Sequence, residues 1–384
     1  MYNAHITGWG KYLPNKIISN TELAQTAPID AEWVKTRTGI ESRHFAEPKQ
    51  ASADMAARAA RAALQVADLD PAQLDLIICA TNSPDFLFPA TACLVQDALG
   101  ATNAGAFDLA AGCSGFVYAL TVADRFIRTG AYRHILVVGV ETVAHMLDFT
   151  TPLCAYFGDG AGAVVVSANE QPGGMLSFLL KADGSGGDLL ILPAGGSRNP
   201  TTHATLDQGL QYGRTDGKAI YRFGLRAMLY TARELLKSAR LTLDDIDLFI
   251  PHQTNQTLIR AAAEKMRMPP EKTFINVAQH ANLSSAAIPV SLCDAIEQGR
   301  IKPGSRVLMT VFGGGLTYAG MIWHWSQPVK RKPMSFVRRL WHALWDAQAA
   351  FRSRLFHLEH RLDALAPGDE EPDEARQRNA NREA

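Results

Sequence analysis

The chain has 384 residues, of which 47% are apolar and 20% are charged, and its formal net charge at pH 7 is zero. This length and composition are typical of a globular protein with a large core in one or two domains. The balanced charge argues against nucleic acid as the main partner, because proteins that bind nucleic acids usually carry a strongly basic face.

Targeting signals and cysteine usage indicate the compartment. The N-terminal stretch MYNAHITGWGKYLP has no basic start followed by an apolar core, so it does not resemble a signal peptide. No apolar run approaches the ~20 residues that span a bilayer. The five cysteines are scattered and never form a CxxC pair, which argues against a disulfide framework and against a zinc site. We therefore predict a cytoplasmic protein.

The predicted elements repeat in the same order in two parts of the chain. A helical stretch at 53–68 precedes the apolar run LDLIICATN at 74–82, and a helical stretch at 222–240 precedes IDLFIPHQTN at 246–255. Both apolar runs are typical of short buried strands. Such a repeat indicates a duplicated fold.

In each repeat, a second helical stretch and a further strand come next. The stretches 113–130 and 282–299 have equal lengths, and the apolar runs at 134–140 and 306–312 follow them. Helices that alternate with short apolar strands indicate mixed or parallel sheets covered by helices. We therefore predict two similar α/β units that are stacked face to face.

The composition changes after the second unit. We place the two halves at 1–172 and 173–325, and a remaining segment at 326–384. This segment carries apolar residues at an alternating four-three spacing, which form one face of an amphipathic helix. They are Val337, Trp341, Leu344, Phe351, Leu355, Leu358 and Leu362. The polar end, from Pro367, is predicted to be disordered.

The sequence leaves two roles open for this amphipathic helix. Because it has a basic flank, the segment 330–362 fits peripheral contact with the inner face of a membrane, or contact with a partner helix. It fits equally well against the body of its own chain or that of a dimer mate.

The stretch AFDLAAGCSGFVYAL (106–120) places Cys113 where a helix begins. The positive end of a helix dipole lowers the pKa of a cysteine there and favours the nucleophilic thiolate. Small neighbours let a substrate carbonyl approach the backbone. The alternative is that Cys113 is a buried apolar residue like most free cysteines. That alternative describes the others, which are Cys79, Cys93, Cys154 and Cys293.

Three further motifs lie at the ends of strands or the start of a helix. His252 in PHQTN follows an apolar strand, where an imidazole can donate to a thioester oxygen or carry a proton. Asn282 begins a helix and could equally be a simple N-cap. The cluster FGGGLTYAG (312–320) either exposes backbone N–H groups for an oxyanion or forms a tight turn. Because strand ends and helix starts gather in such folds, we expect Cys113, His252 and Asn282 to meet.

Together these motifs are specific, and across residues 1–325 the sequence resembles the ketoacyl-ACP synthase III family of the thiolase superfamily. The matching motifs are WVKTRTGI (33–40), FPATAC (88–93), AGCSGF (111–116), FGDGAGA (157–163), PHQTN (251–255), ANLSSAAIP (281–289) and FGGG (312–315). The resemblance implies a thiolase-like duplicated αβαβα layered fold, to which this chain adds its C-terminal helix and tail.

The resemblance also implies an acyltransferase reaction without a metal or redox cofactor. Cys113 would attack an acyl-CoA, and the backbone N–H groups of Cys113 and Gly314 would stabilise the oxyanion. Malonyl-ACP or malonyl-CoA would then lose carbon dioxide, while His252 and Asn282 donate hydrogen bonds to the enolate. The product would be a β-ketoacyl thioester for fatty acid, related lipid or secondary-metabolite synthesis.

The family pattern further implies contacts with substrates and partners. Trp33 would stack on the adenine of CoA, and Arg37 lies in the same matching motif. Phe88 would line the acyl tunnel of a neighbouring subunit, which implies a homodimer. Arg222 and Lys265 would lie near the portal, where an acidic acyl carrier protein docks.

The sequence departs from that family pattern at three places. Thr151 and Pro152 stand where an arginine usually sandwiches the adenine, and Thr257 stands where a carrier-binding arginine is common. The segment FLF (86–88) is bulkier than usual and would reshape the acyl tunnel.

Other members of the superfamily provide the alternatives. A degradative thiolase would carry a second cysteine in the late glycine motif, where this chain has FGGG. Elongating synthases carry a second histidine at the position that Asn282 occupies here. Plant-type polyketide synthases share the three residue types but end in a different glycine motif. A non-decarboxylative acyl-CoA condensing enzyme and a non-catalytic partner subunit stay open.

Overall fold

The protein is described by a computed structural model that covers residues 2–326, 345, 347–349, 351–355 and 358. Its first sheet has five strands in the order β1-β7-β6-β4-β5. These are β1 (Asn3–Tyr12), β7 (Gly160–Asn169), β6 (His134–Glu141), β4 (Leu76–Ala80) and β5 (Gly105–Leu109). The first two pairings along the sheet, β1 with β7 and β7 with β6, are antiparallel, and the last two are parallel.

The second sheet repeats this pattern with four strands in the order β8-β13-β12-β11. They are β8 (Gly174–Ala182), β13 (Thr317–His324), β12 (Arg306–Gly313) and β11 (Leu248–Pro251). Again two antiparallel pairings are followed by a parallel one. A parallel bridge between Phe249 and Thr273 stands where the first sheet has its fifth strand. The sheets therefore draw their strands from either side of residue 172, although the domain boundary itself stays a prediction.

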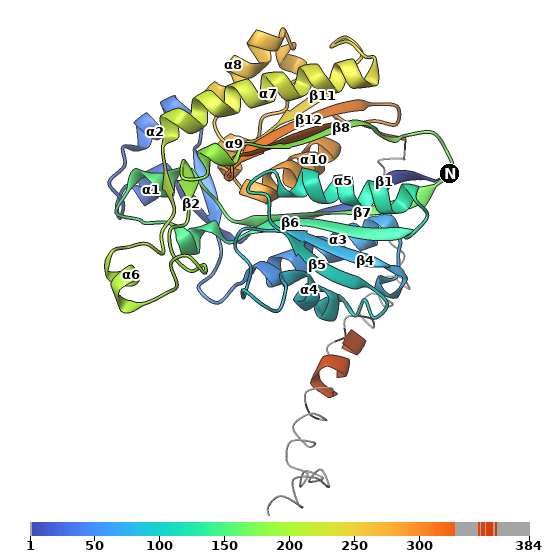
Figure 1. Cartoon of the computed structure of the whole chain (residues 1–384), viewed down its shortest axis with the longest axis horizontal. Helices are drawn as coiled ribbons and strands as arrows, with labels where there is room; N and C mark the ends of the chain where they lie inside the picture. Colours follow the sequence, from blue (N-terminus) through green and yellow to red (C-terminus); the bar gives the residue numbers. More distant parts are fainter. Residues whose placement is uncertain (1, 327–344, 346, 350, 356–357, 359–384) are drawn as a thin grey trace, which may run out of the picture.

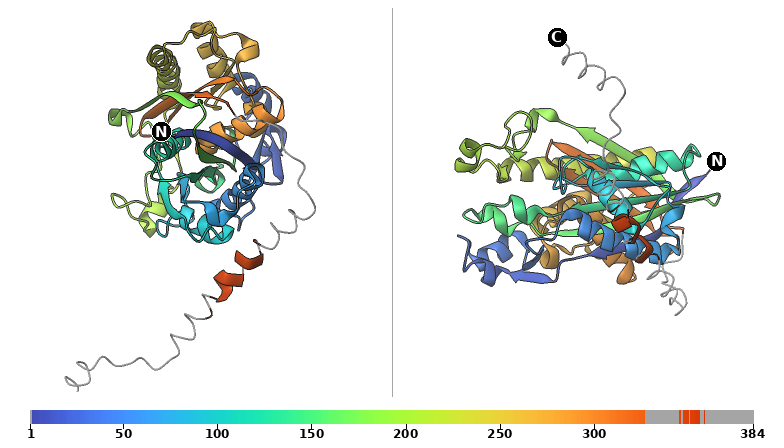
Figure 2. Two further views of the ribbon diagram at one scale, coloured as in Figure 1. Left: turned by 90° about the vertical axis from the view of Figure 1, so that its right-hand side faces the viewer. Right: turned by 90° about the horizontal axis from the view of Figure 1, so that it is seen from below.

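The helices complete five layers, which Figures 1 and 2 show from three directions. The long helices are α3 (Ser52–Ala67), α4 (Thr91–Leu99), α5 (Gly115–Arg128), α7 (Gly217–Ala239), α8 (Gln256–Met266) and α10 (Ala287–Glu297). Helices α5 and α10 lie between the sheets and form one core with both of them. Helices α3 and α4 cover the outer face of the first sheet, and α7 and α8 cover the second. The predicted αβαβα fold is confirmed.

Shorter elements build the loops around one edge of the two sheets. The short strands and α-helices are β2 (Lys16–Ser19), α1 (Asn20–Leu23), α2 (Ala31–Thr38), β3 (Ser42–Phe45), β9 (Leu190–Ile191), α6 (His203–Asp207), β10 (Arg214–Thr215) and α9 (Val277–His280). The 3-10 turns are η1 (Pro71–Gln73), η2 (Val143–Met146), η3 (Pro152–Ala155), η4 (Gly184–Gly186), η5 (Pro270–Lys272) and η6 (Ser284–Ala286).

Helix α3 packs close to β1 because the facing residues are glycines on the strand and alanines on the helix. A Cβ atom on Gly8 would stand 2.1 Å from the carbonyl oxygen of Ala63, and one on Gly10 would stand 2.4 Å from that of Ala59. The alanine-rich face of α3 is fully buried along this contact. The pattern of small residues therefore sets the spacing between the outer helix layer and the first sheet.

The second repeat differs from the expected regular helix over 282–299. Helix α10 begins only at Ala287, after the 3-10 turn η6. Ala281 and Ser284 both have positive φ angles, of 54° and 50°, which interrupt a regular helix. The prediction of a helix starting at Asn282 was therefore wrong at its first turn.

Ala349, in the C-terminal segment, packs against the body of the chain. The described residues of this segment are helical, and a Cβ atom on Gly100, at the end of α4, would stand 3.0 Å from the Cβ of Ala349. Phe351, Leu355 and Leu358 are exposed. The other predicted apolar residues, Val337, Trp341, Leu344 and Leu362, lie outside the described residues, as does the polar end. Among the described helices, none is both long enough and apolar enough to cross a membrane.

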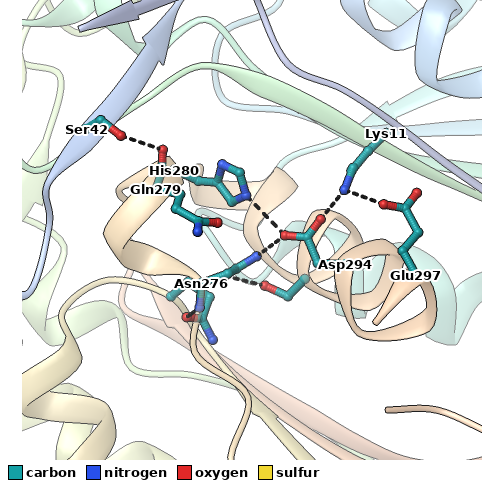
Figure 3. A network of polar contacts seen from close by, with 9 residues as sticks. Lys11, Ser42, Asn276, Gln279, His280, Asp294 and Glu297 are labelled. Carbon is teal, nitrogen blue, oxygen red and sulfur yellow. Dashed lines mark hydrogen bonds and ion pairs between the residues drawn. The ribbon is translucent and has the colours of Figure 1, made fainter. Parts of the chain in front are cut away.

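A buried ionic network joins the two halves (Figure 3). The carboxylate of Asp294, on α10, accepts hydrogen bonds from the ammonium of Lys11, on β1, and from Nε2 of His280 at 3.1 Å. It also accepts one from the Asn276 amide at 2.7 Å. Burial alone would raise the pKa of Asp294, but the bonds from His280, Lys11 and Asn276 lower it to about 2.

Lys11 is held in its charged form by the same network. Burial opposes the ammonium, but its hydrogen bonds to Asp294 and Glu297 raise the pKa of Lys11 overall. A lowered acid pKa stabilises the fold above the ordinary pKa of Asp, ~3.9, and this stabilisation is lost as pH falls through about 2. The raised pKa of Lys11 contributes below its ordinary value, ~10.4. The network is therefore strongest between about pH 4 and pH 10.

We predict that Asp294→Asn lowers the free energy of unfolding by about 2 kcal/mol at pH 7, because charged hydrogen bonds to a buried carboxylate are lost. The difference from the unsubstituted protein should narrow from pH 4 toward pH 2, as Asp294 becomes protonated. Urea unfolding at several pH values measures this. Glu297→Gln is the control, because its carboxylate contacts the same Lys11 at 2.9 Å but is 38% exposed. Equal losses for both variants would contradict the buried network.

Candidate active site

The turn that carries Cys113 joins β5 to α5. Ser114 is the N-cap of α5, and its N–H bonds to the carbonyl of Ala111 at 3.1 Å, while the N–H of Gly115 bonds to that of Gly112 at 3.0 Å. These two bonds form a tight turn around Cys113, whose side chain is 6% exposed. The nucleophile candidate therefore lies just before the helix, as the sequence predicts.

A second turn, between β12 and β13, presses against the first. Gly112 has a φ of +56°, and a Cβ on it would stand 2.6 Å from the carbonyl oxygen of Gly314. A Cβ on Gly313 would stand 2.4 Å from the backbone nitrogen of Cys113. Only glycines allow the two backbones to approach so closely. As a result, the backbone N–H groups of Cys113 and Gly314 lie near the Cys113 sulfur, where they favour the charged form and act to lower the pKa of the thiol.

His252 follows β11 and is almost completely buried. Its backbone N–H bonds to the carbonyl of Thr310 at 2.8 Å, and its ring meets that of Phe312 edge-on, with centroids 5.2 Å apart. Its Nδ1 atom has no hydrogen-bond partner among the described residues. Burial lowers the pKa of His252 to about 3. The imidazole is therefore neutral near pH 7.

Asn282 is held on three sides. Its N–H bonds to the carbonyl of Tyr156 at 2.9 Å, and its own carbonyl accepts from Gly158 at 3.1 Å. Its Oδ1 accepts from the N–H of Ser284 at 2.9 Å. The side-chain oxygen thus caps the following turn, and the amide nitrogen has no partner within residues 2–326. Capping and donation to a ligand are therefore compatible, because they use different atoms.

These residues line one pocket of about 1230 Å³. Cys113, His252 and Asn282 all contribute to its wall, together with Phe312 and Gly313. The three residues that were expected to meet therefore line the same pocket. Other lining residues come from α2, the turn η3, the paired strands β9 and β10, the start of α7 and the start of α8; examples are Trp33, Arg37, Thr151, Pro152, Leu190, Arg214, Lys218, Arg222 and Thr257.

A smaller pocket, of about 290 Å³, lies on another side of Cys113 and Gly314. Apolar side chains dominate its wall: Val143, Met146, Leu147, Leu153, Phe157, Leu190, Ile191 and Leu192. Glu141 and Ser284 also line it. Cys113 thus stands where a large polar-mouthed pocket and a small apolar pocket meet.

The environment of Cys113 corrects one expectation. Burial raises the pKa of its thiol to about 11, and the nearby Glu141 carboxylate adds to the rise. A hydrogen bond from Ser284 and the N–H groups of Cys113 and Gly314 oppose it without cancelling it. The expected lowering of the pKa by the helix dipole was therefore wrong, because the cost of burying an anion outweighs it.

The residues predicted to contact substrates and partners fall into two groups. Trp33, Arg37 and Arg222 line the large pocket, and the backbone carbonyl of Arg37 accepts a hydrogen bond from Thr257 at 2.9 Å. Phe88 and Lys265 are exposed and line neither of the two pockets. The structure therefore brings three of the five to the site.

Sequence reasoning missed two residues of this site. Ser284 contacts Cys113, yet in the sequence it is only one of two serines that follow Asn282 in the ANLSSAAIP motif. Glu141 is fully buried and lines the small pocket together with Cys113 and Ser284. A signal for Glu141 existed, because an acidic residue directly ends the apolar strand HILVVGV, where a buried charge needs a special reason.

Comparisons with known proteins agree with this geometry. Residues 107–184 match the family model "3-Oxoacyl-[acyl-carrier-protein (ACP)] synthase III", and residues 236–325 match the model of its C-terminal part. A β-ketoacyl-[acyl-carrier-protein] synthase III from Syntrophomonas wolfei is 46% identical over 84% of this chain and 97% of its own length. One from Caldanaerobacter subterraneus is 43% identical over 84% and 98%.

Solved structures give the same result. The crystal structure of 3-oxoacyl-[acyl-carrier-protein] synthase III from Aquifex aeolicus has a TM-score of 0.78 and 39% identity, over 84% of this chain and all of that one. The priming β-ketosynthase of the R1128 polyketide pathway has a TM-score of 0.78 and 32% identity, over 85% and 97%.

The fold and these relatives define a thiolase-like condensing enzyme. More specifically, the chain belongs to the 3-oxoacyl-ACP synthase III family and is an acyltransferase of the β-ketoacyl-ACP synthase III type. The resemblance read from its motifs is confirmed. The C-terminal family model ends at residue 325, so the segment 326–384 lies beyond it.

Proposed function

We propose that this protein condenses an acyl-CoA starter with malonyl-ACP or malonyl-CoA through an acyl-Cys113 intermediate. The observation that carries the proposal is the junction at Cys113. There, the backbone N–H groups of Cys113 and Gly314 lie near the sulfur and favour its charged form, and His252 and Asn282 line the same pocket. The arrangement offers a nucleophile, an oxyanion site and two further donors.

The two backbone N–H groups suit the tetrahedral intermediate of acyl transfer. The groups of Cys113 and Gly314 are fixed by the glycine contact, so they need no rearrangement when negative charge develops on the thioester oxygen. The small apolar pocket beside Cys113 would hold the acyl chain, and the large pocket would hold the pantetheine arm. Trp33 and Arg37 would contact CoA at the mouth of the large pocket.

His252 and Asn282 suit the second half-reaction. Because His252 is neutral and one of its nitrogens carries hydrogen, it can donate to the enolate oxygen that forms when malonyl thioester loses carbon dioxide. The Asn282 amide nitrogen would be the second donor. Arg222, at the pocket mouth, and Lys265, on α8, would attract the acidic carrier protein.

We predict that Cys113→Ala abolishes acyl transfer from acyl-CoA, whereas His252→Ala and Asn282→Ala keep it and lose condensation by about 10²–10³-fold each. Intact-mass spectrometry after mixing with an acyl-CoA series should show one added acyl group in the unsubstituted protein and in both donor variants. Carbon dioxide release from malonyl-ACP and from malonyl-CoA then measures the second step.

The same measurements test the alternatives. Acylation of Cys113 without carbon dioxide release from either malonyl thioester would favour a non-decarboxylative condensing enzyme. No acylation by any acyl-CoA from acetyl to long chains, together with stoichiometric co-purification of a second synthase chain, would favour a partner subunit. Cys293→Ala is the matched control, because Cys293 is buried outside both pockets and should leave acylation unchanged.

We also propose a homodimer in which Phe88 enters the acyl pocket of the partner copy. Phe86, Leu87 and Phe88 are 58%, 85% and 86% exposed, which is unusual for three consecutive large apolar side chains. They lie in the loop before α4, whose first residues Thr91 and Ala92 bond to Asp108 of β5. Strand β5 is the edge of the first sheet, and no strand pairs with its other side among the described residues. Apolar loops and unpaired strand edges favour association.

We predict that Leu87→Asp weakens self-association by at least ~30-fold, because it places a charge in the centre of the proposed interface. Sedimentation velocity over a range of concentrations measures this effect. Leu206→Asp is the control, since Leu206 is a 43% exposed leucine on α6, away from β5. A monomer at micromolar concentration in the unsubstituted protein would contradict the proposed dimer.

The C-terminal segment supports a third proposal, that of a cytoplasmic enzyme held peripherally at a membrane. Phe351, Leu355 and Leu358 lie on described helical residues and stay exposed, so the body of this chain does not cover them. Basic residues at 330–332 precede them. An apolar helical face with a basic flank binds anionic lipid surfaces because its apolar side chains are buried in the membrane and its basic residues are attracted to the negative charge.

We predict that the full chain floats with vesicles that contain anionic lipid, and that removal of residues 330–384 abolishes flotation without changing acylation of Cys113. Vesicles of neutral lipid are the control for electrostatic attraction, and less of the full chain should float with them than with anionic vesicles. Failure of both chains to bind either vesicle would contradict membrane contact and leave the dimer mate as the surface that this helix covers.

A further inference from the structure

A buried carboxylate lies one hydroxyl group away from the nucleophile. The Ser284 hydroxyl is 3.4 Å from the Cys113 sulfur and 3.1 Å from Oε1 of Glu141. All three residues are buried, and Glu141 is 0% exposed. Because Ser284 has a single hydroxyl hydrogen, it can donate to only one of these neighbours at a time, and the other must donate to it or lose the bond.

Neutral donors hold Glu141 in place. Its carboxylate accepts from Ser83 Oγ at 2.7 Å, from the Asn82 amide at 2.6 Å and from the backbone N–H of Asn82 at 3.2 Å. The N–H of Ser285 adds a longer bond at 3.4 Å. No ion pair among residues 2–326 involves Glu141, so it is not half of a structural salt bridge. Its negative charge faces the thiol without a cation to neutralise it.

We propose that Cys113, Ser284 and Glu141 form a proton relay that shares a single negative charge between the sulfur and the carboxylate. This proposal rests on the proposed role of Cys113 as nucleophile, but it does not depend on which thioester the enzyme uses. Ser284 contacts the reacting sulfur, and Glu141 acts through Ser284 as a positioning residue.

The transfer balances as follows. The S–H bond of Cys113 breaks and its proton moves to Ser284 Oγ, while the O–H bond of Ser284 breaks and that proton moves to Oε1 of Glu141. The products are a thiolate, an unchanged hydroxyl and a neutral carboxylic acid. The number of charges in the buried site stays the same, and no proton has to leave for solvent before the sulfur attacks.

Electrostatics favours one shared charge over two separate ones. Burial raises the pKa of Glu141, although its hydrogen-bond donors oppose the rise, and burial together with the Glu141 charge raises the pKa of Cys113. Two anions this close in a buried site repel strongly, so the second ionisation is pushed to high pH. The pair therefore titrates as a unit.

Two other titratable groups face this pair. Asp159, before β7, is buried, and burial together with the Glu141 charge raises its pKa to about 6, against the hydrogen bonds from Ala46 and Ala144. His252 is neutral at and above pH 5 because burial lowers its pKa to about 3. Neither supplies a positive charge to the thiolate, so Ser284 and the backbone N–H groups are its donors.

A shared charge has a specific pH signature. Once Glu141 has ionised, further rises in pH do not increase the amount of thiolate, because forming it returns a proton to Glu141. The reactivity of the sulfur is then constant until the second ionisation begins. An isolated thiol differs, since its reactivity rises tenfold per pH unit until its own pKa.

The test is the rate at which iodoacetamide alkylates Cys113 between pH 5 and pH 10, followed on the Cys113 peptide by mass spectrometry, so that exposed Cys93 does not interfere. The unsubstituted protein should show a plateau about two pH units wide or more. Glu141→Gln should match it at the acidic end, show no plateau, and become faster at alkaline pH. If the plot of rate against pH for Glu141→Gln still shows an inflection near pH 6, that inflection is due to ionisation of Asp159.

The variant Ser284→Ala tests the relay in the same alkylation experiment, independently of Glu141→Gln. It removes the donor to the thiolate but leaves the Glu141 charge, so the rate should fall about tenfold at every pH while the plateau remains. Ser177→Ala is the control, because Ser177 is also buried but donates to the carbonyl of Leu235 at 3.1 Å, outside the site. It should leave the pH profile unchanged.

Three results would overturn the relay. A tenfold rise per pH unit in the unsubstituted protein, without a plateau, would show that the two groups ionise independently. Identical profiles for the unsubstituted protein and folded Glu141→Gln would reduce Glu141 to a structural role. An unchanged alkylation rate in Ser284→Ala would show that this hydroxyl does not connect the two groups. The first and third results decide the question even if Glu141→Gln does not fold. Because iodoacetamide is not a substrate, none of these outcomes depends on the condensation reaction.

Discussion

The contact between two glycine turns determines the rest of the site. Gly112 and Gly313 bring the backbone before α5 against the backbone after β12, so that the first half supplies the sulfur and the second half supplies Gly314 beside it. Any side chain at these positions would overlap a neighbouring backbone atom and separate the halves. The proposed oxyanion site would therefore be a property of the interface between the halves, formed only when both sheets are packed on their shared helix layer.

The electrostatics of the site follows from its depth. His252 is neutral, Asn282 offers an amide, and the Cys113 thiol is costly to ionise. A charged enolate or oxyanion would thus meet oriented neutral dipoles in a region with little water, where such dipoles act strongly. The ionic network at Asp294 holds Asn276 and His280, and His280 stands two residues before Asn282 (Figure 3).

Much of this could be predicted from the sequence, because periodicity and motif order report on local structure. The strands around 134–140 and 306–312 and the helices around 53–68 and 222–240 are found within a few residues of their expected positions. The start of α10 could not be predicted, since positive φ angles at Ala281 and Ser284 arise from tertiary packing. The raised pKa of Cys113 was missed for the same reason: a helix start is visible in sequence, but burial is not.

The equivalence of the two halves has a consequence for their history. Cys113 stands two residues before α5, and Asn282 stands two residues before η6, which leads into α10, so the sulfur and the amide occupy corresponding places in the repeat. An ancestral assembly of two identical halves would have offered two nucleophiles or two donors at its junction, never one of each. A chain that carries both halves with different sequences can place a sulfur in one and an amide in the other, and so can divide the proposed roles of attack and charge stabilisation between them.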